Sequence, residues 1–203
     1  MAAARLCAWR RPRTPATLHR YLRQSREALL WKLDGLSERD QRRPLTPTGT
    51  NLLGLIKHEA FCEQGYLGDT FGRPGPLPDL WADLTHAEDN ADMFAAEDES
   101  AADVVAMARA AWAHADATVD ALDLDASGRV PGWPAERAEI TLHQALVHLL
   151  VDVARHVGHA DILREQLDGS AGLRPDMDNL PEQDQAWWAE HVARLQRIAD
   201  ARG

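Results

Sequence analysis

Residues 140–167 constrain the fold more than any other part of this sequence. The stretch reads ITLHQALVHLLVDVARHVGHADILREQL and contains no proline, so it can continue as one long helix. At about 100° per residue, its apolar side chains spread over nearly the whole circumference of that helix. Such a helix is expected to be buried at the centre of the molecule.

Four side chains that can bind a metal interrupt this apolar background, namely His148, Asp152, His156 and His159. On a helix they fall within an arc of roughly 80°. Buried polar groups need a hydrogen-bond partner, a metal or a shared cavity, so the arc is the leading candidate for a site. His148 and His159 lie about 16 Å apart along the axis, too far to share one ion. We therefore expect His148 in a pocket wall or in the core.

The rest of the sequence predicts an all-α fold. Strand-like alternation of useful length is lacking, and long loops rich in glycine and proline separate the helical patterns. We expect a four-helix bundle with an additional C-terminal helix, in a single domain of residues 16–203 that follows a disordered leader of residues 1–15. Helical periodicity runs over residues 16–36, 50–71, 99–122, 140–167 and 182–201.

Composition excludes several classes of protein. The net charge of -10 argues against a nucleic-acid partner, which needs clustered lysine and arginine. Two cysteines, Cys7 and Cys62, are too few for a disulfide framework, and a reducing cytoplasm is the expected compartment. No apolar run approaches the roughly 20 residues that cross a bilayer, so a membrane is not expected as a partner.

Several motifs carry a family resemblance: REALLWKLDGLSE, TPTGTNLLGLIKH, ARHVGHADILREQLDG and a late pair of tryptophans. Together they resemble the DUF664 (mini-circle protein-like) branch of the DinB-like superfamily, over residues 16–198. The resemblance implies an up-up-down-down four-helix bundle that is often a homodimer. It also implies a divalent metal, zinc or nickel, bound by one histidine of the second helix and two of the fourth.

Carried onto this sequence, the resemblance assigns His58, His156 and His159 as metal ligands. The wider superfamily often spaces the last two ligands as HxxxH, but Arg155 stands at that position here. Asp152 is therefore the alternative third ligand. From the residues alone, histidines at i and i+3 on one helix can both reach one ion, and a histidine from another helix completes a three-ligand site.

Four residues are candidates for binding a cofactor or substrate: Glu63, His148, Asp152 and Trp133. Trp133 stands in a loop between Gly132 and Pro134, where it could line a cavity or join the core. Asp152 could orient His156 or lie on the surface, and Glu63 could be structural or solvated. Cys62 is expected to be a small buried hydrophobe rather than a reactive thiol.

The long acidic loop at residues 72–100 is expected to cover a site. Its apolar residues Trp81, Met93 and Phe94 could attach it to the core. The acidic run within this loop lacks the glycine and the spacing of a calcium-binding hand, which argues against calcium.

Two functions remain open from the sequence. Characterised relatives include enzymes that use mycothiol or bacillithiol, so the first is a metal-dependent S-transferase, or a hydrolase-like enzyme, acting on a small thiol and an electrophile. The metal would activate the thiol as a nucleophile. The second is a non-enzymatic, stress-associated bundle that binds a ligand or a partner and holds a structural metal or none.

Overall fold

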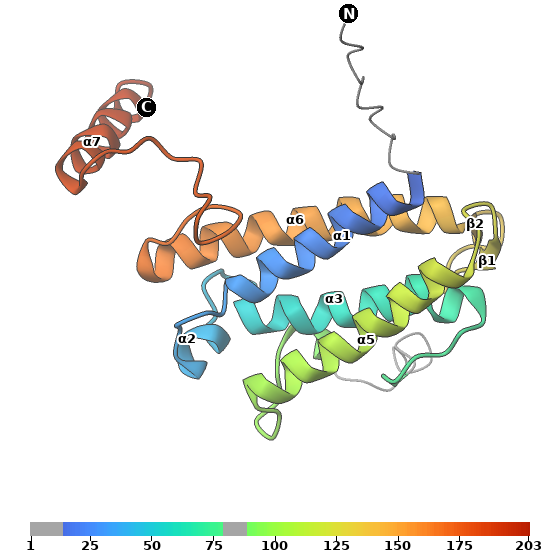
Figure 1. Ribbon diagram of the computed structural model, residues 1–203. Helices are drawn as coiled ribbons and strands as arrows, with labels where there is room; N and C mark the ends of the chain where they lie inside the picture. Colours follow the sequence, from blue (N-terminus) through green and yellow to red (C-terminus); the bar gives the residue numbers. More distant parts are fainter. Residues whose placement is uncertain (1–13, 79–88) are drawn as a thin grey trace, which may run out of the picture. The chain divides into compact units, whose positions relative to one another are not determined.

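The computed structural model describes residues 14–78 and 89–203, and the chain divides into two compact units, residues 1–171 and residues 172–203. The first unit is a helical bundle (Figure 1), which confirms the all-α fold. Its long helices are α1 (Thr14–Trp31), α3 (Leu52–Leu67), α5 (Ala101–Ala121) and α6 (Leu142–Asp168). Shorter elements connect them: α2 (Glu38–Arg42), η1 (Asp69–Phe71), η2 (Ala91–Met93), β1 (Ser127–Arg129) and β2 (Glu139–Thr141).

Helices α1 and α6 run in the same direction. Arg164, near the C-terminal end of α6, donates a hydrogen bond to the carbonyl of Lys32, just beyond the end of α1 (3.0 Å). Helix α3 runs against α6, because the ring of His58 lies beside that of His156 while Tyr66 lies beside His148.

Helices α3 and α5 are parallel, since the ammonium group of Lys57 near the start of α3 contacts Glu99 just before α5 (2.7 Å). In chain order the four long helices therefore run up-down-down-up. A four-helix bundle was expected, but the directions of its helices differ from the expected ones. In an up-up-down-down order α1 would be parallel to α3, and α5 to α6. Here α1 is parallel to α6, and α3 is parallel to α5. The physical reason is the long connection at residues 68–100, since parallel neighbours need a chain long enough to return to the starting end.

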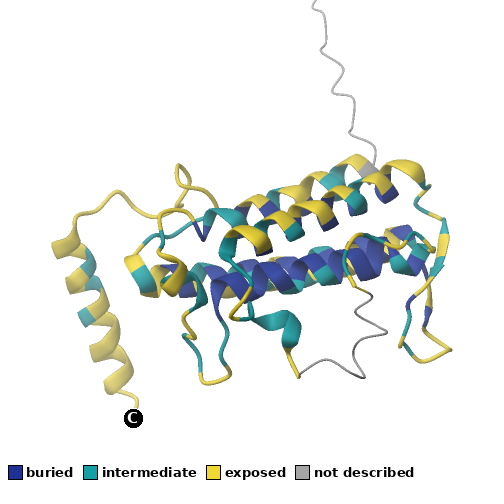
Figure 2. Ribbon diagram, turned by 90° about the horizontal axis from the view of Figure 1, so that it is seen from below, coloured by how far each residue is buried: buried dark blue, intermediate teal, exposed yellow. Residues whose placement is uncertain are grey.

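Helix α3 is the central helix of the bundle. It buries 14 of its 16 residues, and Figure 2 shows it as the long dark-blue helix of the unit. Helix α6 instead exposes one face, with Val147, Val151 and Ile162 at 41%, 67% and 58% exposure. The expectation that residues 140–167 are buried all round is therefore wrong. A helix can have apolar residues on every side and still lack another helix packed against one of those sides.

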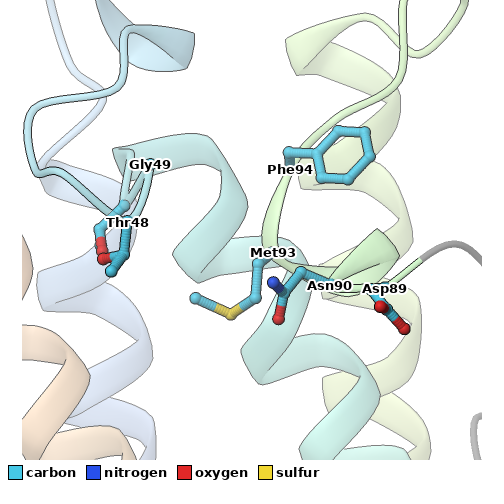
Figure 3. Close-up of a pocket in the computed structure, with 7 residues that line it drawn as sticks. Thr48, Gly49, Asp89, Asn90, Met93 and Phe94 are labelled. Atoms are coloured by element: carbon cyan, nitrogen blue, oxygen red, sulfur yellow. The ribbon is translucent and has the colours of Figure 1, made fainter.

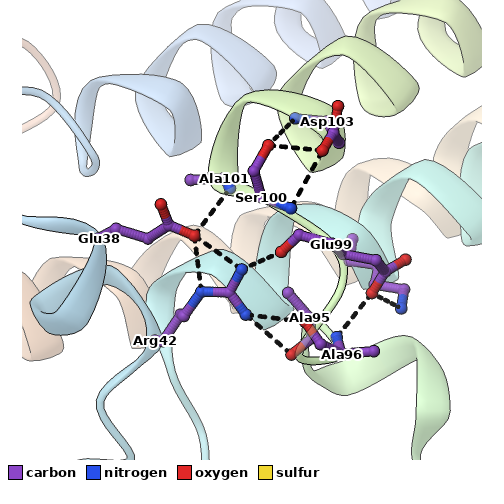
Figure 4. Close-up of polar contacts among 9 residues, drawn as sticks. Glu38, Arg42, Ala95, Ala96, Glu99, Ser100, Ala101 and Asp103 are labelled. Atoms are coloured by element: carbon purple, nitrogen blue, oxygen red, sulfur yellow. Dashed lines mark hydrogen bonds and ion pairs between the residues drawn. The ribbon is translucent and has the colours of Figure 1, made fainter.

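The segment before α5 is attached to α2 through one guanidinium group (Figure 4). Arg42 donates to the carbonyls of Ala95 (3.0 Å) and Ala96 (3.1 Å) and also to the carbonyl of Glu99. Its remaining hydrogen bonds go to the carboxylate of Glu38, one turn earlier on α2. This side of the long loop is therefore fixed against the bundle.

The element η2 lies directly against the start of α3. The side-chain amide of Asn51 caps α3 and donates to the carbonyls of Gly49 (3.1 Å) and Met93 (3.3 Å). A Cβ atom at Gly54 would lie 1.8 Å from the carbonyl oxygen of Met93, so only glycine permits this approach. Met93 packs against the core, as expected from the sequence, whereas Trp81 lies outside the described residues.

A cavity of about 660 Å³ lies beside this contact, between the loop at residues 48–50 and the segment at residues 89–94 (Figure 3). Thr48, Asn90 and Met93 face it from the two walls, and Phe94 also lines it. The long acidic loop thus does more than connect α3 to α5, since its last part forms one wall of a pocket.

A short hairpin connects α5 to α6. Strands β1 and β2 pair antiparallel with three residue pairs, a feature too short to be seen as alternation in the sequence. Thr141 ends β2 and caps α6, with Gln144 completing a capping box. The long helix therefore begins at Leu142, two residues later than the periodicity suggested.

The second unit contains α7 (Gln185–Asp200), which Asp184 caps. No residue of α7 is buried, and its apolar face remains exposed. The rings of Trp187 and His191 stack at 4.9 Å. Among the described residues, no helix combines the length and the apolar character that spanning a bilayer would require.

Asp168 offers a test of the last turn of α6. Its carboxylate accepts hydrogen bonds from Arg164, which lowers the pKa of Asp168 to about 2. Because the pKa is lower in the folded state, the pair stabilises the fold above about pH 4 and ceases to do so as the pH falls towards 2. Asp168 is partly exposed, so Asp168→Asn should cost no more than about 1 kcal/mol at neutral pH.

Urea unfolding at a series of pH values measures this effect. The difference between the Asp168→Asn variant and the wild type should vanish near pH 2. Asp120→Asn, at an exposed position of α5, is the matched control and should leave stability unchanged. A constant difference across the whole pH range would show that Asp168 does not act through its charge.

Candidate metal centre

Three side chains meet between α3 and α6 in an arrangement that can hold a metal ion. His58 comes from α3, and Asp152 and His156 come from α6, one helical turn apart. One ligand atom from each lies within 4.8 Å of the others, and all three residues are half-buried. The two imidazole rings meet edge to face at 76°, with centroids 4.8 Å apart. The antiparallel packing of the two helices therefore brings residues far apart in sequence to one point.

A carboxylate from outside the long helices holds His58. Asp92 of η2 lies with one oxygen 2.6 Å from Nδ1 of this imidazole. Burial would lower the pKa of His58, but the hydrogen bond to Asp92 and the charge of Glu59 outweigh burial and raise it. The same hydrogen bond lowers the pKa of Asp92. The last part of the long loop thus contacts the site directly.

A second carboxylate holds His156. Glu59, next to His58 on α3, lies with Oε1 2.5 Å from Nδ1 of His156. The Glu59 side chain is 0% exposed, and its other oxygen has no hydrogen-bond partner among the described residues. Burial raises the pKa of Glu59, although the hydrogen bond to His156 acts in the opposite direction. Asp152 also approaches His156, at 4.0 Å, which is beyond hydrogen-bonding distance.

Cys62 lies at the edge of the site, with Sγ 3.4 Å from Nε2 of His58. It is buried, as expected from the sequence. Burial, together with the nearby carboxylates Glu59 and Asp152, raises the pKa of its thiol well above the usual value. The thiol is therefore protonated at neutral pH and is a poor nucleophile.

The third ligand of the predicted set, His159, lies at the surface. Its ring centroid is 5.7 Å from that of His156, and it is not part of the close group formed by His58, Asp152 and His156. The set of three histidines remains a prediction. The distances support the alternative, in which Asp152 is the third ligand.

Trp133 and His148, two of the residues predicted to bind a cofactor or substrate, lie beside each other. Trp133 and His148 form an aromatic group with Tyr66, with ring centroids 4.7 to 6.0 Å apart. His148 is one turn from Asp152 along α6, and Tyr66 is one turn from Cys62 along α3. The aromatic group therefore adjoins the candidate metal centre.

Glu63 lies elsewhere, in the core. Its side chain is 0% exposed, and its carboxylate accepts hydrogen bonds from Arg26 (2.5 to 3.0 Å). Arg26 also donates to Asp116 (2.6 Å), which in turn contacts His19 (2.6 Å). Burial raises the pKa of Glu63 to about 7, even though Arg26 acts to lower it. These contacts give Glu63 a structural role in the bundle, and a role in binding a ligand remains a prediction.

The residues present fit a divalent metal. Two imidazoles and one carboxylate are a common ligand set of catalytic zinc, and they leave one position for water or substrate. Imidazole also suits nickel and iron. Carboxylates on the other ring nitrogen, such as Glu59 and Asp92, recur around metal-bound histidines.

Sequence reasoning did not include Glu59 and Asp92 in the site. A signal for Glu59 was present, since an acidic residue within the apolar pattern LLGLIKHEAF needs a buried partner. Asp92 gave no such signal, because it lies in an acidic loop 34 residues away from His58.

Comparison with solved structures supports the helical-bundle fold. A solved structure described as the conserved protein of a locus from Enterococcus faecalis is 16% identical, with a TM-score of 0.58. The likeness covers 78% of this chain and 99% of that chain, and at this identity it supports the fold alone. No curated protein matches the sequence.

The family comparison is more specific. The sequence model described as Mycothiol-S-transferase matches residues 17–169, a range that runs from α1 to the end of α6. It includes His58, Asp152 and His156, together with both carboxylates that hold the imidazoles. The chain therefore belongs to the mycothiol S-transferase family, a DinB-like family, as the motifs of its sequence implied.

Proposed function

We propose that this protein is a metal-dependent S-transferase that joins a low-molecular-weight thiol, mycothiol or a similar molecule, to an electrophile. The observation that carries the proposal is the meeting of His58, Asp152 and His156 within 4.8 Å, in a chain of the mycothiol S-transferase family. Zinc is the proposed metal, and nickel is the alternative.

A zinc ion at this site would leave one coordination position for the thiol and lower the thiol pKa from about 8.5 towards neutrality. In the transfer, the thiolate sulfur bonds to the electrophilic carbon, and the leaving group departs with its electron pair. The thiol proton passes to solvent, and no oxidant or reductant is needed. In the metal-free protein the buried thiol of Cys62 remains protonated, because burial raises its pKa.

The aromatic group of Tyr66, Trp133 and His148 is proposed to bind one of the two reactants. It adjoins the metal centre along the same two helices, and Trp133 and His148 keep part of their surfaces accessible. Aromatic rings offer a flat apolar surface with polar edges, which suits an electrophile that carries a ring or an apolar chain.

Metal analysis combined with a conjugation assay tests the function. The purified protein should retain about one equivalent of zinc or nickel, or should melt at a higher temperature when either ion is added. With the metal present, it should accelerate conjugation of mycothiol to monobromobimane, and a chelator should abolish the acceleration. Absence of both bound metal and a thermal shift would refute the metal site. Bound metal without acceleration over the uncatalysed reaction would refute the transferase and leave a structural metal.

A further inference from the structure

We infer that Glu59 and Asp92 are positioning residues, which hold the imidazoles of His156 and His58 so that both Nε2 atoms are presented to one ion. The inference rests on the proposed metal site and adds to it two residues that would not contact the metal. It follows from the pairing of each ring with its own carboxylate, at 2.5 Å and 2.6 Å.

Each imidazole can offer a metal only the nitrogen that does not face its carboxylate. An ionised carboxylate only accepts hydrogen bonds, so the nitrogen that faces it carries the hydrogen. Both contacts are made by Nδ1. In the neutral form of each ring, Nε2 therefore keeps the lone pair with which a metal ligand binds.

The two carboxylates come from different parts of the fold. Glu59 follows His58 on α3 but reaches across to α6, so one helix supplies a ligand and also holds the ligand of its neighbour. Asp92 comes from η2, which Gly54 and Asn51 hold against α3. Both carboxylates are therefore fixed by parts of the fold that do not depend on the metal.

The pair of Glu59 and His156 differs from an ordinary structural contact. His19 also lies 2.6 Å from a carboxylate, that of Asp116, but Asp116 accepts a hydrogen bond from Arg26 as well. In the described part of the chain, Glu59 has one oxygen committed to His156 and the other without a partner. A buried carboxylate oxygen without a partner costs free energy, so this carboxylate is poorly explained by stability alone, which favours a role in setting the orientation of the ring.

The test compares Glu59→Gln and Asp92→Asn with the wild type. Each substitution keeps the size of the side chain but replaces an obligate acceptor with an amide that can also donate. Asp98→Asn, at an exposed acidic position of the same loop, is the control for the loss of one charge. Zinc affinity is measured by competition with a chelating dye, and the tautomers of the metal-free protein are measured by long-range proton–nitrogen NMR at alkaline pH.

We expect zinc affinity to fall about 10- to 100-fold in each of the two variants and to stay unchanged in Asp98→Asn. The wild type should show His58 and His156 with hydrogen on Nδ1, and each variant should lose this preference at its own histidine only. Metal-free melting temperatures should stay close to that of the wild type.

Unchanged zinc affinity or unchanged tautomers in the variants would overturn the inference. A fall in the metal-free melting temperature, with unchanged affinity of the folded protein, would assign the two carboxylates a purely structural role. If the wild type itself binds no zinc, nickel or cobalt, the proposed function fails, and the NMR result still decides whether the carboxylates set the tautomers.

Discussion

Replacing His156 with alanine is expected to weaken zinc binding by more than roughly 100-fold while the bundle stays folded. Loss of a residue that only supports a ligand already costs about 10- to 100-fold, so loss of a ligand should cost more. The substitution leaves the carboxylate of Glu59, which is 0% exposed, without its partner, so some loss of stability is expected as well. A competition titration with a chelating dye measures the affinity, and circular dichroism reports the fold.

Two further alanine variants identify the third ligand. Asp152→Ala should weaken zinc binding to a similar extent, whereas His159→Ala should have little effect, because His159 lies outside the close group. His143→Ala, at an exposed position of the same helix, is the control. A strong effect of His159→Ala with none of Asp152→Ala would restore the set of three histidines that the family resemblance implied.

Arg26→Met is expected to destabilise the protein by about 3–5 kcal/mol, the largest effect on folding that we predict. The substitution leaves the fully buried carboxylate of Glu63 without its cation. Because the pKa of Glu63 is about 7, the loss should be largest at alkaline pH, where the group is ionised, and smaller as the pH falls below 7. Urea unfolding at several pH values measures both the size and the trend.

Arg23→Met is the matched control for that experiment. Arg23 lies one turn earlier on α1 and approaches the same Asp116 at 3.8 Å, but its side chain is 61% exposed. An exposed pair contributes about 0–1 kcal/mol, so this variant should unfold almost like the wild type. Equal losses in the two variants would mean that burial of the Arg26–Glu63 pair does not govern its contribution.

The helices could be predicted from the sequence, but their neighbours could not. Periodicity located α6 to within two residues, because each position reports whether its side chain is apolar. It did not reveal that Val147 and Val151 face solvent or that α3 is the central helix. Those facts depend on which helices pack together, and that choice depends on the long connection between α3 and α5.

The candidate site could also be predicted only in part from the sequence. His58 and His156 could be identified because helical spacing and family motifs both pointed to them, and the structure brings their rings together. The competition between His159 and Asp152 could not be decided from an arc on a helical wheel, since both lie on it. Asp92 was beyond reach, because no periodicity relates a residue of a loop to a helix 34 positions away.

The close contact between Gly54 and Met93 helps to determine whether Asp92 can reach His58. Successive residues of the loop, Asp92 and Met93, contact α3 at positions one turn apart, His58 and Gly54. A chain that keeps every ligand but carries a larger residue at position 54 would push the loop outward and withdraw Asp92 from His58. Ligand residues alone are therefore an incomplete criterion for transferring metal binding between members of the family, and a glycine four residues before the histidine of α3 belongs with them.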